Sequence, residues 1–399
     1  MLLRALEKII LREWQYLWYD RALRRIMLLI PLAAVAIFSL TYYNDSILSI
    51  PVAVVDLDRS DTSQAIIQEL ANHENLDIVA QNDDYWAMEK MLANGEIVGG
   101  IVIPENLAQD IARRSSPTIY MALDGTNMAY STNTTAALLE VIGVISARTG
   151  VSMILAQQSP QPLIGPAVPQ PSLTAAEALS LYMPVNFVDE SWFNPALSYR
   201  AFLLLVLLIN VWQQCCTLLG CTNIIGETGM RSWLQVKSSG FSLCKLFFSK
   251  SVAQLIVMFA SVVPIYLCAF VVLKLPLNVS LAFLLLFTFV FLLALHALAT
   301  FMSSIAQDTV DASRFGMLIA LPSFLLCGYT WPLEVMPDIV VRIAKLLPQT
   351  WFFQGLNYAQ FKAASPDLWQ HYFLVLLSMA VLFYLLAGVT TWVREKINA

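Results

Sequence analysis

Six long apolar stretches constrain this chain more than any other feature of its sequence. A helix that crosses a bilayer needs about 20 mostly apolar residues. Of the 399 residues, 58% are hydrophobic and only 13% are charged, whereas soluble domains carry about 25% charged residues. The sequence therefore predicts an α-helical integral membrane protein with six transmembrane helices. We expect these helices at Ile26–Tyr43, Leu197–Cys221, Ser251–Leu273, Val279–Met302, Phe315–Trp331 and His371–Val393.

Lysines and arginines in the short segments beside these stretches predict the orientation of the chain. Residues 1–25 hold six of them, residues 222–250 hold four, and the tail adds Arg394 and Lys396. Six spans place these segments on one side, which we expect to be the cytoplasmic side of a bacterial inner membrane. Residues 44–197 hold 18 acidic and five basic residues and are expected outside. The net charge of −5 excludes a basic nucleic-acid-binding protein.

The first 25 residues predict an amphipathic helix that lies flat on the inner membrane surface. Apolar residues recur at spacings of three and four, and charged residues fill the other face. The apolar set is Leu2, Leu3, Leu6, Ile9, Ile10, Trp14, Leu17 and Trp18, and the charged set is Arg4, Glu7, Lys8, Arg12 and Glu13. Two interpretations stay open: a lipid anchor alone, or a surface that also touches a cytoplasmic partner.

Residues 44–196 predict an extracytoplasmic α/β domain, because short β-branched strands alternate with helices. Strands are expected at Ile50–Asp58, Leu76–Ala80, Ile97–Ile103 and Thr118–Leu123, and helices from Asp61, at Tyr85–Ala93, from Pro104 to Arg114 and at Asn127–Gln157. Five prolines between residues 159 and 171 predict a semi-rigid connector. Asp56, Asp58 and Asp61 lack the spacing of a calcium loop, so we interpret them as helix-capping residues.

A short amphipathic pattern, Gly226–Val236, lies between the second and third spans. Met230, Trp233 and Leu234 form an apolar face that follows a charged start at Glu227. A helix of this kind suits docking into a groove on another protein. A plain surface loop is the alternative that the pattern leaves open.

The sequence contains no motif for hydrolysing ATP. The P-loop pattern G-x-x-x-x-G-K-[ST] is absent, and no lysine follows a glycine. The fourth span carries His296, which we expect to be a packed, hydrogen-bonded residue rather than a proton relay. The six cysteines form no C-x-x-C zinc pattern, and no catalytic constellation stands out. Energy for any transport must then come from a partner or an ion.

The most specific pattern follows the fifth span. Leu321–Pro337 reads L-P-S-F-L-L-C-G-Y-T-W-P-L-E-V-M-P, and Leu346–Thr350 reads L-L-P-Q-T. This resembles the membrane permeases of type-2 ABC exporters, whose pattern is P-x-x-L-L-S-G-x-x-x-P-x-x-x-M-P and then L-P-x-T. Cys327 stands where that family has serine. The resemblance continues in the same order at Val54–Asp58, Gly99–Pro104 and Phe193–Pro195, so it covers nearly the whole chain.

The resemblance implies two functional segments. Gly226–Val236 corresponds to the coupling helix that sits in a cleft of the cytoplasmic ATPase. The partner-binding residues would be Glu227, Gly229, Met230, Arg231, Trp233 and Leu234, although the family's E-R-E-x-G-T is kept only at Glu227 and Gly229. The segment 332–350 corresponds to short helices that enter the outer leaflet and return, with Gly328, Pro332, Pro337 and Pro348 at the corners.

The predicted function is that of the permease subunit of an ATP-driven exporter for a hydrophobic or amphiphilic molecule. The resemblance implies a dimer with itself or a related permease, and a separate ABC ATPase that binds ATP and Mg. This chain itself is expected to bind no cofactor and no metal, and spans two and five are expected to line the pathway. The outer domain is expected to gate the exit or to contact a periplasmic adaptor. The alternatives are a membrane receptor or assembly factor and a secondary transporter that uses His296.

Overall fold

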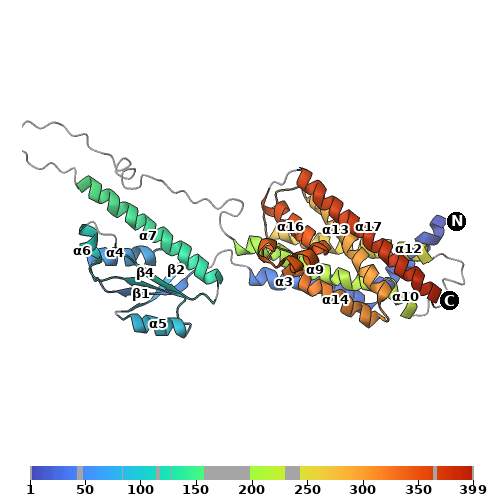
Figure 1. Ribbon diagram of the computed structural model, residues 1–399, viewed down its shortest axis with the longest axis horizontal. Coiled ribbons are helices and arrows are strands. Elements are labelled where there is room, and N and C mark those ends of the chain that lie inside the picture. Colours follow the sequence, from blue (N-terminus) through green and yellow to red (C-terminus); the bar gives the residue numbers. More distant parts are fainter. Residues whose placement is uncertain are drawn as a thin grey trace, which may run out of the picture. The chain divides into compact units, whose positions relative to one another are not determined.

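The computed structural model describes residues 2–42, 48–82, 84–113, 117–126, 128–156, 198–229, 243–362 and 366–397. The chain divides into two compact units, one made of Met1–Asp45 with Ser191–Ala399 and the other of Ser46–Glu190. The first unit is a bundle of helices, and the second is a small sheet covered by helices (Figure 1). The proline-rich connector and Phe193–Pro195 lie outside the described residues.

Among the described residues, the bundle contains six helices that are long and apolar enough to cross a membrane, which confirms the predicted number. They cover Arg21–Thr41, Tyr199–Cys221, Leu246–Val272, Leu281–Ile305, Thr309–Leu326 and Pro366–Arg394. The elements are α1 (Leu2–Tyr19), α2 (Arg21–Arg24), the π-helical η1 (Arg25–Leu29), α3 (Ile30–Thr41), α9 (Tyr199–Cys221), α10 (Ile225–Gly229), α12 (Leu243–Leu267), the π-helical η2 (Cys268–Val272), α13 (Leu281–Ile305), α14 (Thr309–Leu326), the 3₁₀ turn η3 (Leu333–Val335), α15 (Asp338–Lys345), α16 (Pro348–Phe361) and α17 (Pro366–Ile397).

Local capping sets span boundaries that differ from those expected. The first span begins at Arg21 because Asp20 has an extended backbone and its carboxylate accepts hydrogen bonds from the amides of Ala22 and Leu23, in the first turn of α2. The fifth span runs over Thr309–Leu326, six residues earlier at its start than expected, because Asp308 caps it by accepting from the Asp311 amide. It ends before Gly328, whose positive φ of 80° suits the helix stop.

The spans of the bundle meet in close contacts that small residues permit. A Cβ at Gly220 of α9 would lie 2.7 Å from the Ala299 Cβ of α13, so the two helices approach backbone to backbone. Two turns earlier in α13, the ring of Phe291 stacks on the ring of Phe352 of α16, with ring centroids 4.0 Å apart. α13 is thereby the central helix, in contact with α9, α12, α14, α16 and α17.

The ends of α13 and α17 show which parts of the chain gather at one end of the bundle. Phe283 contacts Phe373, and Ser304 bonds Thr390, so the two helices run side by side in the same direction. Arg394 then donates to the carbonyl of Ala306, 2.8 Å away, beyond the end of α13. α1, α10 and the C-terminal end of α17 all lie at this end (Figure 1).

The second unit is a four-stranded sheet between two layers of helices. Its strands are β1 (Ile50–Asp56), β2 (Leu76–Asn82), β3 (Gly99–Ile103) and β4 (Tyr120–Leu123), in the order β2-β1-β3-β4 with only β4 antiparallel. α4 (Asp61–Ala71), α6 (Leu107–Ala112) and α7 (Met128–Ala156) cover one face, and α5 (Tyr85–Ala93) covers the other. Gly100 allows α5 to pack closely on the sheet, because a Cβ at this position would lie 2.2 Å from the Met88 sulfur.

Asp56 and Asp58 accept hydrogen bonds in loops and at helix starts, but none of Asp56, Asp58 and Asp61 is the N-cap residue that the sequence predicted. The Asp56 carboxylate accepts from the amides of Asp58 and Arg59, at 3.1 and 3.0 Å, and from the hydroxyl of Ser63 at 2.7 Å. The N-cap of α4 is Ser60, in a capping box with Ser63, rather than Asp61. The helix expected from Pro104 begins only at Leu107, because Asn106 has a positive φ of 63° that no helical residue adopts.

The contact at Gly220 predicts a stability difference between two glycines in spans. Gly220→Ala must displace α13 and should cost about 1–3 kcal/mol through overpacking. Gly388→Ala is the matched control, because Gly388 lies on α17 with nothing within 4 Å of a Cβ. Thermal unfolding in detergent should show a lower midpoint for Gly220→Ala alone, and equal midpoints would contradict the close approach of α9 and α13.

Candidate functional site

The segment after the second span is pinned to two other helices by buried hydrogen bonds. The side-chain amide of Asn223 donates to Ser251 Oγ at 2.9 Å and to Thr300 Oγ1 at 3.1 Å. The backbone amides of Ile224 and Ile225 both donate to Ser303 Oγ at 3.0 Å. The residues that lead into the predicted coupling segment are therefore held by α12 and α13.

Glu227 lies on α10 and is the centre of a buried ion cluster, which consists of Arg12, Glu13, Glu227 and Lys250. Lys250 Nζ lies 3.0 Å from Glu227 Oε1 and 3.6 Å from Glu13 Oε1. Arg12 donates to the same Glu227 oxygen at 2.5 Å. The side chains of Glu13, Glu227 and Lys250 are each 2–3% exposed, whereas Arg12 is 43% exposed. The cluster joins α1, α10 and α12 and carries equal positive and negative charge.

The energetics of this ion cluster make it a strict constraint on geometry. Taking an ion out of water costs several kcal/mol, and the cost is offset only when every charge has a well-placed partner. Two cations and two carboxylates meet here, so none of the four is left uncompensated. Any movement of α10 away from α12 would leave Lys250 and Glu227 buried without each other, so α1, α10 and α12 should move together.

Hydrogen bonds continue from the ion cluster into the spans. Gln254, one turn beyond Lys250 on α12, donates from Nε2 to Glu13 Oε1 at 3.3 Å. Its Oε1 lies 3.0 Å from His296 Nε2, so this ring nitrogen must carry the hydrogen. His296 Nδ1 then accepts from the Tyr384 hydroxyl at 2.8 Å. His296 is thus a buried, hydrogen-bonded residue that connects α12, α13 and α17, as the sequence indicated.

The sequence missed most of the ion cluster. It placed Glu13 on the water-facing side of the N-terminal helix and began the third span at Ser251. In the structure Glu13 faces α12, and the third span begins at Leu246 and includes Lys250. The signal that could have found the pair is a lone lysine inside an apolar helical run, because such a lysine needs a carboxylate partner.

Most of the other residues predicted to bind a partner are not among those that the structure describes. Gly229 is the last residue of α10. Met230, Arg231, Trp233 and Leu234 lie outside the described residues. The structure therefore describes only residues 226–229 of the predicted coupling segment. These residues include Glu227 of the ion cluster.

The predicted re-entrant segment is a chain of short helices with glycine and proline at its corners. Pro332 precedes η3, Pro337 precedes α15, and Pro348 is the first residue of α16. Gly328 is also required sterically, because a Cβ there would lie 2.7 Å from Leu333. The Tyr329 hydroxyl donates to the carbonyl of Phe202 at 2.6 Å, which attaches the segment to the second span.

A cluster of side-chain amides lies where α9, α14 and α16 meet. Gln213 Nε2 donates to Asn210 Oδ1 at 3.1 Å, and Gln349 Nε2 donates to Gln213 Oε1 at 3.2 Å. Gln349 is fully buried, and its Oε1 has no hydrogen-bond partner among the described residues. A polar group of this kind inside a span is costly, so it marks this part of the bundle as a place to look for function.

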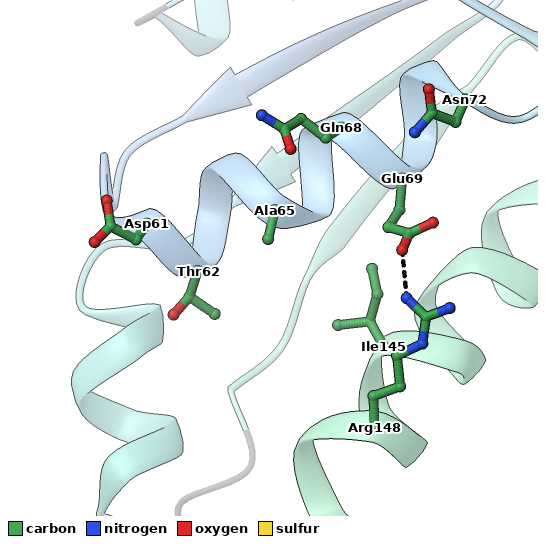
Figure 2. A pocket seen from close by; sticks show the side chains of 8 residues that line it. All are labelled: Asp61, Thr62, Ala65, Gln68, Glu69, Asn72, Ile145 and Arg148. Carbon is green, nitrogen blue, oxygen red and sulfur yellow. Dashed lines mark hydrogen bonds and ion pairs between the residues drawn. The ribbon is translucent and has the colours of Figure 1, made fainter. Parts of the chain in front are cut away.

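The second unit has a groove of about 450 Å³, lined mainly by polar residues, between α4 and α7 (Figure 2). Its lining consists of Asp61, Thr62, Ala65, Gln68, Glu69, Asn72, Ile145 and Arg148. Arg148 of α7 bonds to Glu69 of α4 across the groove, as Figure 2 shows. This ion pair is exposed and contributes little to stability.

Comparisons with known proteins agree with this architecture. The model of a family described as ABC-2 family transporter protein matches residues 22–389, from the first span almost to the end of the last. The probable multidrug ABC transporter permease YbhS of Escherichia coli K12 is 22% identical over 98% of this chain and 97% of its own length. The inner membrane transport permease YhhJ of the same strain is 21% identical over 84% of this chain and 83% of its own length.

The ion cluster predicts a characteristic pattern of stabilities. Lys250→Met should cost about 3–5 kcal/mol, because it leaves two buried carboxylates without their lysine. The variant Lys250→Met with Glu227→Gln should lose about 1–3 kcal/mol less than the two single losses added together. Thermal unfolding in detergent measures these losses, with Lys8→Met, at an exposed position on α1, as the control. Strict additivity would show that Lys250 and Glu227 do not interact.

Proposed function

This chain belongs to the ABC-2 family of transporter proteins as a membrane-spanning permease subunit, and we propose that it exports a hydrophobic or amphiphilic molecule with energy from a separate ATPase. The observation that carries the proposal is the buried ion cluster at the start of the predicted coupling segment. It supplies a stiff connection between a loop that can dock on a partner and the helices of the bundle.

Export is the direction that we favour, and two arguments support it. YbhS carries the name of a probable multidrug permease, and expelling drug-like molecules would require outward transport of apolar cargo. The predicted orientation also places the large second unit outside, where it could act on a molecule that leaves the membrane. Gathering of α1, α10 and the end of α17 at one end of the bundle agrees with both termini being cytoplasmic.

The energy source would be a cytoplasmic ABC ATPase that binds ATP and Mg, since the sequence has no P-loop of its own. Two permeases, identical or related, would face each other above two ATPases. Closure of the ATPases around ATP would push on the segment 226–236. The ion cluster would then convert that push into a rigid-body movement of α1 and α12.

The pathway would run beside the second and fifth spans, as expected from the sequence. The amide cluster of Asn210, Gln213 and Gln349 supports this placement, because it offers hydrogen-bonding groups in an otherwise apolar environment. The buried side-chain oxygen of Gln349 has no donor among the described residues. Asn210 is the partly exposed member of the cluster and would face a pathway between two copies, with Gln213 and Gln349 buried behind it.

The second unit would gate the exit or bind a periplasmic adaptor. Its acidic character, 18 acidic against five basic residues over 44–197, supports an adaptor with a basic surface. Adaptor recovery in a pull-down from membranes should fall when this unit is deleted. Unchanged recovery would remove the adaptor from the proposal and leave export unaffected.

Docking of the ATPase predicts a large effect of two apolar substitutions. Trp233→Ala with Leu234→Ala should weaken ATPase binding by about 30-fold, because a central interface tryptophan contributes about 2 kcal/mol or more. The measurement is copurification of the ATPase with the full-length permease, followed by ATP hydrolysis in proteoliposomes.

The control for this prediction matches the residue types at exposed positions of the second unit. Trp86→Ala with Leu57→Ala should leave both copurification and hydrolysis unchanged, since these side chains are 73% and 38% exposed there. Normal ATPase binding by the Trp233 and Leu234 variant would show that the segment 226–236 is a plain surface loop.

A further inference from the structure

Three arginines form a compact cationic patch where the chain turns from α1 into the first span. Arg21, Arg24 and Arg25 are all exposed and are spaced i, i+3 and i+4, so they share one face of the helix. The opposite face carries Met27, which is buried in the bundle. No carboxylate lies within ion-pair distance of the three guanidinium groups among the described residues. The Asp20 carboxylate is occupied in capping α2.

The exposed surface continues from the arginines along the first span and becomes apolar. Leu28, Leu29 and Leu32 follow the arginines and are 38%, 58% and 49% exposed. Farther along the same span, Ile37 and Leu40 are exposed as well. We call Arg21, Arg24, Arg25, Leu28, Leu29 and Leu32 the span-one stripe. It is cationic at one end and apolar at the other, which complements the phosphate at one end of a phospholipid and the acyl chains at the other.

Two aromatic side chains place the cationic end at the level of lipid head groups. Trp14 and Trp18 on α1 are 45% and 55% exposed, and tryptophan is enriched at the membrane–water interface. The Arg24 guanidinium lies 6.0 Å from the centre of the Trp18 ring and donates to the Trp18 carbonyl at 3.2 Å. This contact holds one arginine toward the interface instead of leaving it free in water.

We propose that the span-one stripe binds an anionic phospholipid, with the lipid phosphate on Arg21, Arg24 and Arg25 and the acyl chains along Leu28, Leu29 and Leu32. Arginine suits this role because its planar guanidinium donates two parallel hydrogen bonds to a phosphate. The lipid would fill the angle between α1 and the first span. The inference does not depend on the substrate or on the direction of transport.

A second copy of the chain is the competing occupant, and charge argues against it. A two-fold interface places the same patch of each copy on its counterpart. Two copies in one membrane share the same orientation, so pairing of their stripes would set three arginines against three arginines. An anionic head group with apolar chains satisfies both ends of the stripe at once.

Lipid binding can be measured on the full-length protein by native mass spectrometry in detergent, titrated with dioleoyl phosphatidylglycerol or dioleoyl phosphatidylcholine. The wild type should bind the anionic lipid more tightly than the zwitterionic one. Replacing the three arginines by glutamine should weaken binding of the anionic lipid by about fivefold per arginine. The control with Lys8, Arg314 and Lys396 replaced by glutamine removes equal charge at exposed positions off the stripe and should bind normally.

A second variant keeps the test valid if the glutamine variant fails to insert correctly. Replacing the three arginines by lysine keeps the charge that orients the span but removes the paired hydrogen bonds, so binding should still fall by a few-fold. The proposal would be overturned if the control variant lost as much binding of the anionic lipid as the arginine variants do. It would also be overturned if the wild type bound both lipids equally. A change in the number of permease copies without a change in bound lipid would assign the stripe to a second copy instead.

Discussion

The ammonium group of Lys250, buried between two carboxylates, is the interaction on which this end of the bundle depends. A buried lysine is tolerated only because Glu227 and Glu13 lie 3.0 and 3.6 Å away, and Arg12 balances the second negative charge. The four residues come from three helices, so the cluster forms only when α1, α10 and α12 are docked together. The N-terminal helix α1 is therefore a part of the bundle.

The two ends of the bundle are built on different principles. At the end that holds the ion cluster, charges and hydrogen bonds reach from Glu13 through Gln254 to His296 and Tyr384. The other end combines stacked aromatic rings such as Phe291 and Phe352 and proline corners with a few hydrogen bonds, such as that of Gln349 to Gln213. Polar connections are directional and break at small displacements, whereas apolar packing tolerates sliding. We therefore expect α1, α10 and α12 to move together at the end with the ion cluster. The helices at the other end would adjust to that movement by sliding.

The sequence predicted the number of spans because average apolarity over about 20 residues is enough to identify a membrane helix. It did not predict where each span begins, since that depends on single caps such as Asp20 and Asp308. The strands and helices of the second unit were predicted from alternating patterns, but the order β2-β1-β3-β4 was beyond local patterns. Pairing of strands depends on contacts between residues that are distant in the sequence.

The candidate site was predictable only in part, and for a physical reason. Glu227 was singled out through a resemblance, but Glu13 was assigned to the water-facing side because helical periodicity sorts residues by polarity alone. A charged residue can face the protein interior when a partner of opposite charge lies there, and Lys250 is 237 positions away in the sequence. Periodicity within one helix cannot reveal such a partner, whereas a lysine within an apolar run signals that a partner exists.

The most direct test asks whether the ion cluster transmits the ATP signal to the spans. A cysteine at position 210, half-buried on α9, would be introduced into a chain without its native cysteines and reconstituted with the ATPase. Its rate of reaction with a water-soluble maleimide is then compared with and without ATP. We predict that ATP changes this rate, and that the change is lost in the charge-neutral variant Glu227→Gln with Lys250→Gln although ATP is still hydrolysed. An unchanged ATP response in that variant would contradict the account.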